Sequence, residues 1–268
     1  MTKHKEYLSR LNTATKYPPI PTYHTMDKGK LSEPAIHFPG EAFVYEKVDG
    51  TNARIVVAPD GDWFIGSRND LLTAKGDRCY NPAEKIVDTV SFIADNSVLP
   101  AGYTARSDQN VNSNNYRVYY GEVYGQGVGA GGKQYAQAPV TGFRLFDIME
   151  FPQQILDLDA PQIATWRDNG GPDFFSVSEL EQTAEYLEIA QVPYLDRVQG
   201  EKLPTDLEGM HKLLQAYLPT TFARLDTGGL GNSEGIVLRS ADRGVIAKAR
   251  FEDYARTFKT KYPAMKQK

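Results

Sequence analysis

The stretch YEKVDGTNARIVVA, residues 45–58, places three charged side chains at the start of a pattern that is otherwise typical of β-strands. After Asn52 the residues alternate and many are β-branched, which favours a strand. Because side chains alternate along a strand with a period of two, Lys47 and Asp49 are expected to lie on one face. The solvated edge of a hairpin shows the same pattern, so the rest of the chain has to decide between these interpretations.

The composition of this chain of 268 residues is that of a soluble globular protein, with a net charge of -4 that argues against coating nucleic acid by bulk electrostatics. A local basic surface is still compatible, because residues 239–268 hold nine bases and three acids, whereas residues 147–190 hold ten acids and one base. The single cysteine, Cys79, excludes an intramolecular disulfide, and the four scattered histidines lack zinc-site spacing. Since no signal peptide or membrane-spanning run is present, we expect a cytoplasmic protein.

Strand and helix patterns follow one another without regular β-α-β alternation, so we expect an α+β fold with mostly antiparallel sheets flanked by helices. The proline-rich residues 1–40 are predicted to have little regular structure, and residues 1–268 are expected to form a single domain. Strands are predicted at residues 42–49, 52–58, 62–68, 117–125, 142–149, 234–239 and 244–250, with Asp60-Gly61 as a hairpin turn. Helices are predicted at residues 82–94, 178–190 and 206–218 and in an amphipathic stretch through Phe251, Tyr254 and Phe258.

Capping patterns define where the internal helices are expected to begin. A polar N-cap followed three residues later by an acid is a capping-box signal, and proline suits the first turn. The predicted caps are Asn81 with Pro82 and Glu84, Ser178 with Glu181, and Thr205 with Glu208.

Five further charged residues interrupt or end the predicted strands, namely Glu122, Asp147, Glu234, Lys248 and Arg250. A buried charge in a sheet is costly unless it is paired or binds a ligand. Each residue alone also fits a strand end or a solvated face, with Lys248 and Arg250 sharing one face. Together they indicate a cleft with acids for a divalent metal and bases for phosphates. The glycine-rich run at residues 121–135 leads to no amphipathic helix, so we interpret it as a loop rather than a dinucleotide site.

Six segments resemble, in order and spacing, the nucleotidyltransferase motifs of ATP-dependent ligases. The resemblance covers roughly residues 17–258 and is to nick-sealing RNA ligases of the RNA ligase 2 type, which implies an ATP-grasp-like ligase adenylation domain. The segments are EKVDGTN (46–52), SR (67–68), GEVYG (121–125), FRLFDI (143–148), EGIVLR (234–239) and AKARFEDY (247–254).

The resemblance implies that Lys47 is the nucleophile that becomes AMP-lysine, with Asp49, Lys248 and Arg250 completing the catalytic set. Lysine is almost entirely protonated at neutral pH, so Lys248, Arg250 and a bound metal are expected to favour the neutral amine. RNA ligases of this type often carry histidine at the position of Asp49, and lysine is usual at the position of Arg250. Gly50 is expected to let the chain turn close to the nucleotide.

The resemblance also assigns the nucleotide, metal and nucleic-acid contacts. Glu46 would lie by the adenine edge, Phe146 would stack on adenine, Asn52 and Arg68 would hold the 5′-phosphate of the nick, and Glu122 would contact the ribose or the metal. The implied ATP-binding set is Glu46, Lys47, Asn52, Arg68, Glu122, Phe146, Glu234, Lys248 and Arg250, and the implied ligands for Mg²⁺ or Mn²⁺ are Glu122, Glu234 and Asp49.

The sequence therefore predicts an ATP-dependent RNA ligase that joins 3′-hydroxyl and 5′-phosphate ends, for example in RNA repair. About ten residues follow the last motif, so no separate C-terminal OB or helical domain is expected, and a partner domain or a homodimer would compensate. The alternatives are a DNA ligase core, which Asp49 fits, a capping guanylyltransferase, and a non-catalytic nucleotide- or nucleic-acid-binding module. The sequence leaves open whether the substrate is a nick, a single-stranded end or a tRNA break.

Overall fold

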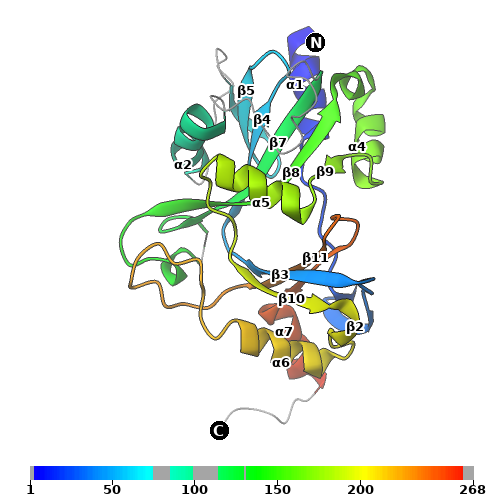
Figure 1. The fold of residues 1–268 in the computed structure, drawn as a ribbon, viewed down its shortest axis with the longest axis vertical. Coiled ribbons are helices and arrows are strands. Elements are labelled where there is room, and N and C mark those ends of the chain that lie inside the picture. Colours follow the sequence, from blue (N-terminus) through cyan, green and yellow to red (C-terminus); the bar gives the residue numbers. More distant parts are fainter. Residues whose placement is uncertain (1–2, 75–84, 99–113, 130, 262–268) are drawn as a thin grey trace. The chain divides into compact units, whose positions relative to one another are not determined.

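The computed structural model describes residues 3–74, 85–98, 114–129 and 131–261, and the chain divides into two compact units (Figure 1). Each unit contains an antiparallel sheet with helices packed on it, which confirms the predicted α+β class. No helix in these described ranges is long and apolar enough to cross a membrane. The first unit consists of Met1–Pro19, Gly50–Gly132 and Ala138–Gln191, and the second of Ile20–Asp49, Lys133–Gln137 and Val192–Lys268.

The first unit is built on a six-stranded sheet in the order β6-β5-β4-β7-β8-β9. Its strands are β4 (Thr51–Val57), β5 (Trp63–Ser67), β6 (Leu71–Ala74), β7 (Asn115–Gly125), β8 (Thr141–Pro152) and β9 (Asp173–Phe174), and its α-helices are α1 (Lys3–Ala14), α2 (Ile86–Ile93), α4 (Ala160–Asp168) and α5 (Val177–Tyr186). The predicted Asp60-Gly61 hairpin is confirmed, because β4 and β5 pair on either side of it and Gly61 has a φ of 87°.

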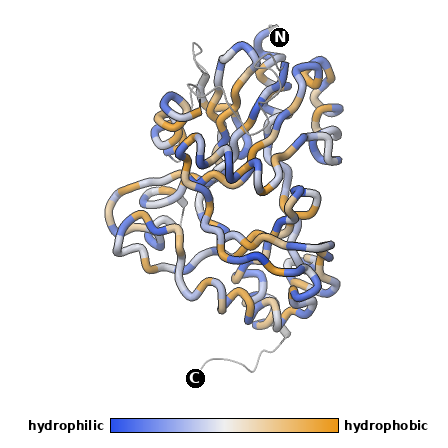
Figure 2. The backbone as a smooth tube through the Cα atoms, viewed as in Figure 1, coloured by the Kyte–Doolittle hydropathy of each residue, from blue (hydrophilic) through white to orange (hydrophobic). Residues whose placement is uncertain are grey.

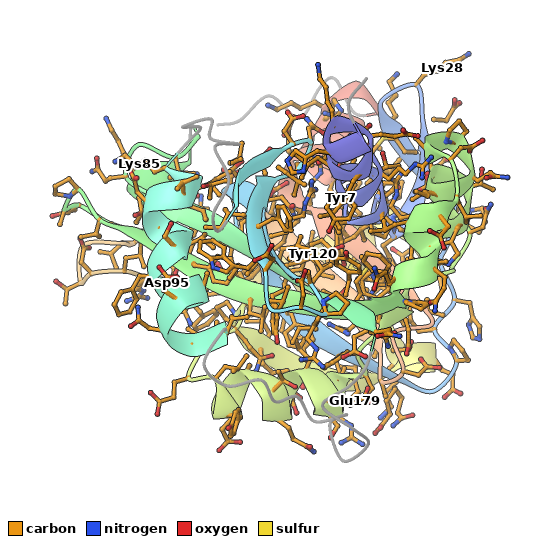
Figure 3. All side chains as sticks on the ribbon, turned by 90° about the horizontal axis from the view of Figure 1, so that it is seen from above. Tyr7, Lys28, Lys85, Asp95, Tyr120 and Glu179 are labelled. Atoms are coloured by element: carbon orange, nitrogen blue, oxygen red, sulfur yellow. The ribbon has the colours of Figure 1, made fainter. Side chains whose placement is uncertain are left out.

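Both faces of the six-stranded sheet are covered by helices. On one face Ile55 and Tyr119 pack with residues of α2 and α5, and on the other Val118 and Tyr120 pack with residues of α1 and α4. Because both faces are covered, the central strands β4 and β7 are mostly buried along their length. Figure 2 shows hydrophobic stretches along the backbone of this unit. In Figure 3 Tyr120 lies among the strands, whereas Asp95 lies exposed just after α2.

The second unit is built on a four-stranded sheet in the order β10-β3-β11-β12 and carries a two-stranded hairpin. One face of the four-stranded sheet, which includes Val44, Ile236 and Ala249, packs with α6, α7 and the hairpin. The strands are β1 (His24–Asp27), β2 (Lys30–Ala35), β3 (Glu41–Lys47), β10 (Tyr194–Gln199), β11 (Gly235–Ser240) and β12 (Ile246–Arg250), and the helices are α6 (Leu207–Tyr217) and α7 (Phe251–Lys261).

The structure overturns the expectation that residues 1–40 lack regular structure. They form α1, β1 and β2, and Pro18 begins the proline-rich run only after α1 has ended at Ala14. Helix α1 is stabilised because Leu11 and Ala14 are fully buried in the core of the first unit. The proline content therefore obscured an amphipathic helix.

Two predicted caps were wrong by one or two residues. Helix α5 begins after Ser176, which forms a capping box with Glu179, and it ends at Tyr186. Helix α6 begins after Asp206, whose side chain accepts a hydrogen bond from the Gly209 backbone. In each case two residues that can cap a helix lie close together in the sequence. The packing of the apolar face of the helix determines which of the two is the N-cap. Helix α2 confirms a helix within the predicted residues 82–94, but it begins only after Lys85, which is its N-cap. The proposed cap at residues 81–84 and Cys79 lie outside the described residues.

Candidate active site

Three strands of the second unit bring Lys47 and Arg250 onto one row of the four-stranded sheet. Lys47 on β3 pairs with Gly235 on β11, and Gly235 pairs with Arg250 on β12. Lys248 precedes Arg250 by two residues on the same strand, so it lies on the same face, as the sequence predicted. This cationic face is opposite the face that packs on α6 and α7.

Glu234 lies next to both cations of this row. Its Oε2 atom accepts a short hydrogen bond from Lys47 Nζ, and its Oε1 atom lies 3.6 Å from Arg250 Nη1. The side chains of Lys47, Glu234 and Arg250 are 23%, 22% and 29% exposed, so the cluster is accessible yet partly desolvated. An ion pair in such an environment is stronger than one on the surface.

The residues around Glu234 fix this cluster at the level of the backbone. Ser233 Oγ donates to the carbonyl oxygen of Lys47 at 3.0 Å, which ties the end of β3 to the start of β11. Gly235 has a φ of 154°, and a Cβ atom there would lie 2.0 Å from the carbonyl oxygen of Ala249. No larger residue fits this position, so the space between Lys47 and Arg250 is left to Glu234.

Asp49 follows the end of β3, so the period-two argument from the sequence does not extend to it. Its backbone N–H donates to Tyr135 Oη at 2.6 Å. Burial raises the pKa of Asp49, the nearby charge of Glu234 raises it further, and Lys47 partly opposes both effects. A carboxylate whose ionisation is disfavoured by burial and by a neighbouring carboxylate suits a divalent cation, which prefers oxygen ligands.

The metal set proposed from the sequence is divided between the two units. Within the part of the chain that the structure describes, no group of three or more histidine, cysteine, aspartate and glutamate side chains has metal-site geometry. Asp49 and Glu234 belong to the second unit and Glu122 to the first. The assignment of these three residues as metal ligands therefore stays a prediction.

Glu46 lies on the opposite face of β3 from Lys47 and is 1% exposed. Its carboxylate accepts hydrogen bonds from Thr221 Oγ1 at 2.5 Å and from the Phe222 backbone at 2.7 Å. Burial raises the pKa of Glu46, although these hydrogen bonds act in the opposite direction. The carboxylate thus holds the loop around residue 221, and its predicted place at the adenine edge stays a prediction.

In the first unit, Asn52 on β4 lies directly opposite Glu122 on β7. Within the described residues, the buried Oδ1 atom of Asn52 has no hydrogen-bond partner, which is the mark of a group reserved for a ligand or water. A Cβ atom on Gly50 would lie 2.3 Å from the carbonyl oxygen of Val123, so glycine is required for close packing on β7. Packing on β7 thus explains Gly50, and its expected close approach to a nucleotide stays a prediction.

Phe146 lies at a β-bulge of β8, where Tyr120 and Gly121 of β7 are paired with Asp147 and Leu145. Its ring contacts the edge of Tyr17 at a centroid distance of 5.1 Å. The hydroxyl of Tyr17 donates to Asp147 Oδ2 at 2.8 Å. This hydrogen bond explains how the carboxylate of Asp147 can be buried within a strand. Stacking of Phe146 on adenine stays a prediction.

The structure also contains a buried cation that the sequence analysis did not single out. Arg54 on β4 is fully buried, with Nη2 donating to Asn12 Oδ1 at 2.5 Å and Nη1 donating to the carbonyl oxygen of Arg68 at 3.2 Å. Burial lowers the pKa of Arg54 to about 10. Arg68 is therefore held in place through its backbone, and its exposed side chain agrees with a role in binding a phosphate.

Tyr135 is a second residue that the sequence analysis missed. It comes from the segment Lys133–Gln137, at the end of the glycine-rich run, and it is fully buried. The backbone of Tyr135 accepts a hydrogen bond from Leu225, and a Cβ atom on Gly229 would lie 2.2 Å from its carbonyl oxygen. The glycines thus let two loops pack closely, and this packing brings the Tyr135 hydroxyl to Asp49. Only the coincidence of two glycine-rich loops hints at this in the sequence.

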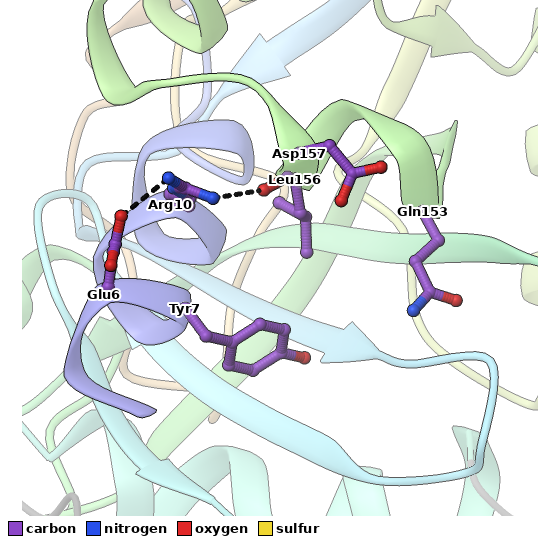
Figure 4. Close-up of a pocket in the computed structure, with 6 residues that line it drawn as sticks. All are labelled: Glu6, Tyr7, Arg10, Gln153, Leu156 and Asp157. Atoms are coloured by element: carbon purple, nitrogen blue, oxygen red, sulfur yellow. Dashed lines mark hydrogen bonds and ion pairs between the residues drawn. The ribbon is translucent and has the colours of Figure 1, made fainter. Parts of the chain in front are cut away.

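A pocket in the first unit lies between α1 and the turn that follows β8 (Figure 4). It contains none of the predicted site residues. Arg10 crosses it and is already bound to Glu6 and to the carbonyl oxygen of Leu156. The remaining lining residues are Tyr7, Gln153 and Asp157.

Comparisons with known proteins identify the family and the fold. The RNA ligase family model matches residues 40–259, which is most of the chain. A search of curated protein sequences found no match. Solved structures of an RNA ligase from Naegleria gruberi are similar in fold. The one with pyrophosphate has a TM-score of 0.52 at 15% identity, and it covers 91% of this chain and 64% of the other.

Two variants of the Naegleria gruberi enzyme give the same result. A lysine-to-alanine variant with ATP and manganese matches with a TM-score of 0.50 at 14% identity over 90% of this chain and 63% of the other. A lysine-to-methionine variant with AMP and manganese matches with a TM-score of 0.51, also at 14% identity and with the same coverage. This chain thus shares the nucleotidyltransferase fold and spans less than two thirds of the length of that ligase.

Proposed function

The chain belongs to the RNA ligase family, and we propose that it is an ATP-dependent RNA ligase that joins 3′-hydroxyl and 5′-phosphate ends through a lysyl-AMP intermediate. The observation that carries this proposal is the contact of Lys47 with Glu234 beside Arg250 on the cationic face. This contact supports the proposal, because a lysine amine, a carboxylate and a guanidinium that lie together can act on one phosphoryl group.

In the first step, Lys47 Nζ attacks the α-phosphorus of ATP. A P–N bond forms, the bond to the bridging oxygen breaks, and pyrophosphate leaves. Glu234 contacts Nζ, so it holds the amine in place and is positioned to accept its proton. Arg250 and Lys248 provide positive charge that stabilises the negative charge developing on the phosphoryl oxygens. Asp49 and Glu234 would hold the Mg²⁺ or Mn²⁺ that accompanies ATP, and this cation would neutralise phosphate charge.

In the second step, an oxygen of the RNA 5′-phosphate attacks the phosphorus of lysyl-AMP, the P–N bond breaks, and Lys47 is released as an amine. In the third step, the 3′-hydroxyl attacks the 5′-phosphate and AMP leaves. We assign Asn52 and Arg68 to the 5′-phosphate, supported by the exposed side chain of Arg68, whose guanidinium can pair with phosphate oxygens.

We assign this chain to the RNA ligase 2 type, on the order and spacing of its motifs. We further infer that both units belong to one nucleotidyltransferase domain, because the family match includes residues of each. Additional contacts with the nucleic acid would come from a partner domain or a second copy of the chain.

The proposal is tested by incubating the purified protein with Mg²⁺ and ATP that is radiolabelled at the α-phosphate. We expect an acid-labile labelled protein band that is lost in Lys47→Ala. Lys212→Ala is the matched control, because Lys212 lies on α6 of the same unit with a side chain that is 71% exposed. An unlabelled wild-type protein that is folded and free of bound AMP would refute the proposal.

The substrate is then identified with nicked duplexes. We expect sealing of a nick whose 3′-hydroxyl strand is RNA, and weaker sealing of an all-DNA nick. Preferential sealing of the DNA nick would identify a DNA ligase core, for which Asp49 is typical. Labelling by GTP in place of ATP would identify a capping-type guanylyltransferase.

A further inference from the structure

Asp253 lies in the first turn of α7 and is 1% exposed. Its Oδ2 atom accepts a hydrogen bond from Arg250 Nε at 2.7 Å, and its Oδ1 atom accepts one from Arg250 Nη2 at 2.9 Å. This is the bidentate pairing that fixes both the position and the plane of a guanidinium group. A cation of the candidate site is thus held by a buried carboxylate three positions further along the chain.

The surroundings of Asp253 keep its carboxylate rigid. Its Oδ1 atom also accepts a hydrogen bond from Arg256 Nη2 at 2.5 Å, and Arg256 Nε donates to the carbonyl oxygen of Gly29 at 2.6 Å. The backbone oxygen of Asp253 accepts a hydrogen bond from Thr257 Oγ1 at 2.7 Å. An acidic residue is also favoured in the first turn of a helix.

This pairing uses one edge of the Arg250 guanidinium and leaves the Nη1 atom directed elsewhere. Nη1 lies 3.6 Å from Glu234 Oε1, which is within ion-pair distance but too long for a hydrogen bond. Without Asp253 the flexible Arg250 side chain is free to move onto Glu234 and compete with Lys47 for its carboxylate. Asp253 therefore keeps Arg250 Nη1 from closing onto Glu234 and leaves this N–H donor able to turn to a phosphate oxygen.

We propose that Asp253 is a positioning residue that holds Arg250 ready to bind the polyphosphate of the nucleotide beside Lys47. This inference rests on the proposed function, because it assumes that Arg250 meets phosphate oxygens. Asp253 itself touches neither the nucleotide nor the nucleophile and acts through Arg250. Its hydrogen bonds to Arg250 also raise the pKa of that guanidinium, in agreement with a permanently charged group.

The competing explanation is that Asp253 only anchors the start of α7 through Arg256 and Thr257. The two explanations differ for Asp253→Glu, which keeps the charge and the helix start but moves the carboxylate by one methylene group. An anchoring role predicts unchanged polyphosphate binding in this variant, whereas a positioning role predicts weakened binding while the thermal unfolding midpoint is maintained.

The test measures binding of inorganic tripolyphosphate by isothermal titration calorimetry, so it does not depend on covalent chemistry. We expect wild type to bind, and Arg250→Met, Asp253→Asn and Asp253→Glu each to weaken binding by about tenfold. Glu252→Gln is the matched control, since Glu252 is the adjacent acid, its side chain is 73% exposed, and it pairs with Arg256 rather than Arg250. This control is expected to bind like wild type.

Lysyl-AMP formation provides the second measurement. Asp253→Glu is expected to raise the KM for ATP by about tenfold and to leave kcat within about twofold of wild type. Binding of tripolyphosphate by Asp253→Glu at wild-type affinity, or no binding by wild type, would overturn the inference. Failure of wild type to form lysyl-AMP would instead refute the proposed function, and calorimetry would still decide the role of Asp253.

Discussion

Two arginines, each on a strand of a different sheet, show how this protein treats charge in contrasting ways. Arg250 is partly exposed, is held by the carboxylate of Asp253 and lies near that of Glu234, and its pKa is raised chiefly by the hydrogen bonds to Asp253. Arg54 is fully buried, is bound by an amide and a carbonyl oxygen, and has its pKa lowered to about 10 by burial. Both residues interrupt a strand pattern, yet Arg250 has carboxylate partners and Arg54 has neutral ones.

The difference indicates which cation is available to a ligand. The carboxylate of Asp253 holds one edge of Arg250 and leaves the Nη1 donor beside Glu234. This donor is partly exposed to solvent, so a phosphate group can reach it. Neutral acceptors around Arg54 hold α1 to the sheet through Asn12, and no solvent reaches the side chain. Arg250 is therefore suited to chemistry and Arg54 to stability.

Truncating these two arginines is expected to have the largest and most opposed effects. Arg54→Ala should lower the free energy of unfolding by about 3 kcal/mol, because it leaves a cavity and removes the donor to Asn12. Arg250→Ala should lower it by less than about 1 kcal/mol but slow lysyl-AMP formation at least ~100-fold. Urea unfolding and single-turnover labelling measure the two effects.

The contrast between the two arginines is refuted if each variant shows the effect expected of the other, or if both variants lose stability and labelling alike. If Arg250→Ala proves as unstable as Arg54→Ala, the site is part of the folding core. If Arg54→Ala folds with wild-type stability, the guanidinium is replaceable and its burial has another cause. Labelling rates are to be compared only between samples that are at least nine-tenths folded by circular dichroism.

A smaller effect is expected for two tyrosine hydroxyls, one in each unit. Tyr135→Phe removes the acceptor of the Asp49 backbone N–H, whereas Tyr116→Phe removes a hydroxyl that lies 2.7 Å from that of Tyr7. Each change should lower the free energy of unfolding by about 1 kcal/mol. Only Tyr135→Phe should also slow lysyl-AMP formation, by about tenfold, because it loosens the segment after the nucleophile. Equal labelling rates in the two variants would exclude a positioning role for Tyr135.

Motif spacing predicted the residues of the cationic face but not the interactions that hold them. In the sequence Lys47 lies almost two hundred residues before Glu234 and Arg250. The three residues become neighbours through the antiparallel pairing of β3, β11 and β12. Their chemistry was predictable because a charge in a strand needs a partner. Asp253 was hidden because an acid in the first turn of a helix is ordinary, and only the three-residue separation from Arg250 marks it.

The remaining misses have one physical origin, which is competition between local signals that only packing resolves. Helix α1 was missed because the proline-rich residues after it dominated the reading of the N-terminal segment. The caps of α5 and α6 were misplaced because neighbouring polar residues offer the same hydrogen bond. Tyr135 was missed because its role depends on two loops that meet only in the folded chain.

The smallest expected effect is a pH dependence that belongs to the second unit. His24 is fully buried between Tyr254 Oη at 2.7 Å and the carbonyl oxygen of Thr205 at 2.9 Å. Burial lowers the pKa of His24, and the more distant charges of Glu33 and Asp206 only partly oppose this effect. The first unit contains one histidine, His4, which is exposed on α1.

Because the folded-state pKa of His24 lies below its unfolded value, the unfolded chain binds the proton first as the pH falls. The contribution of His24 to stability is therefore complete above about pH 6.5 and is lost below it. Hydrogen exchange at pH 7.5 and 5.5 should show faster opening of α7 and β1 at the lower pH, and an unchanged rate for β4 and β7. His24→Gln should reduce this difference between the units, and the remainder is due to His211, whose pKa burial also lowers and which packs against α7. An equal acid response of β4 and β7 would show that the sensitivity is not due to His24, and that the two units do not differ in this respect.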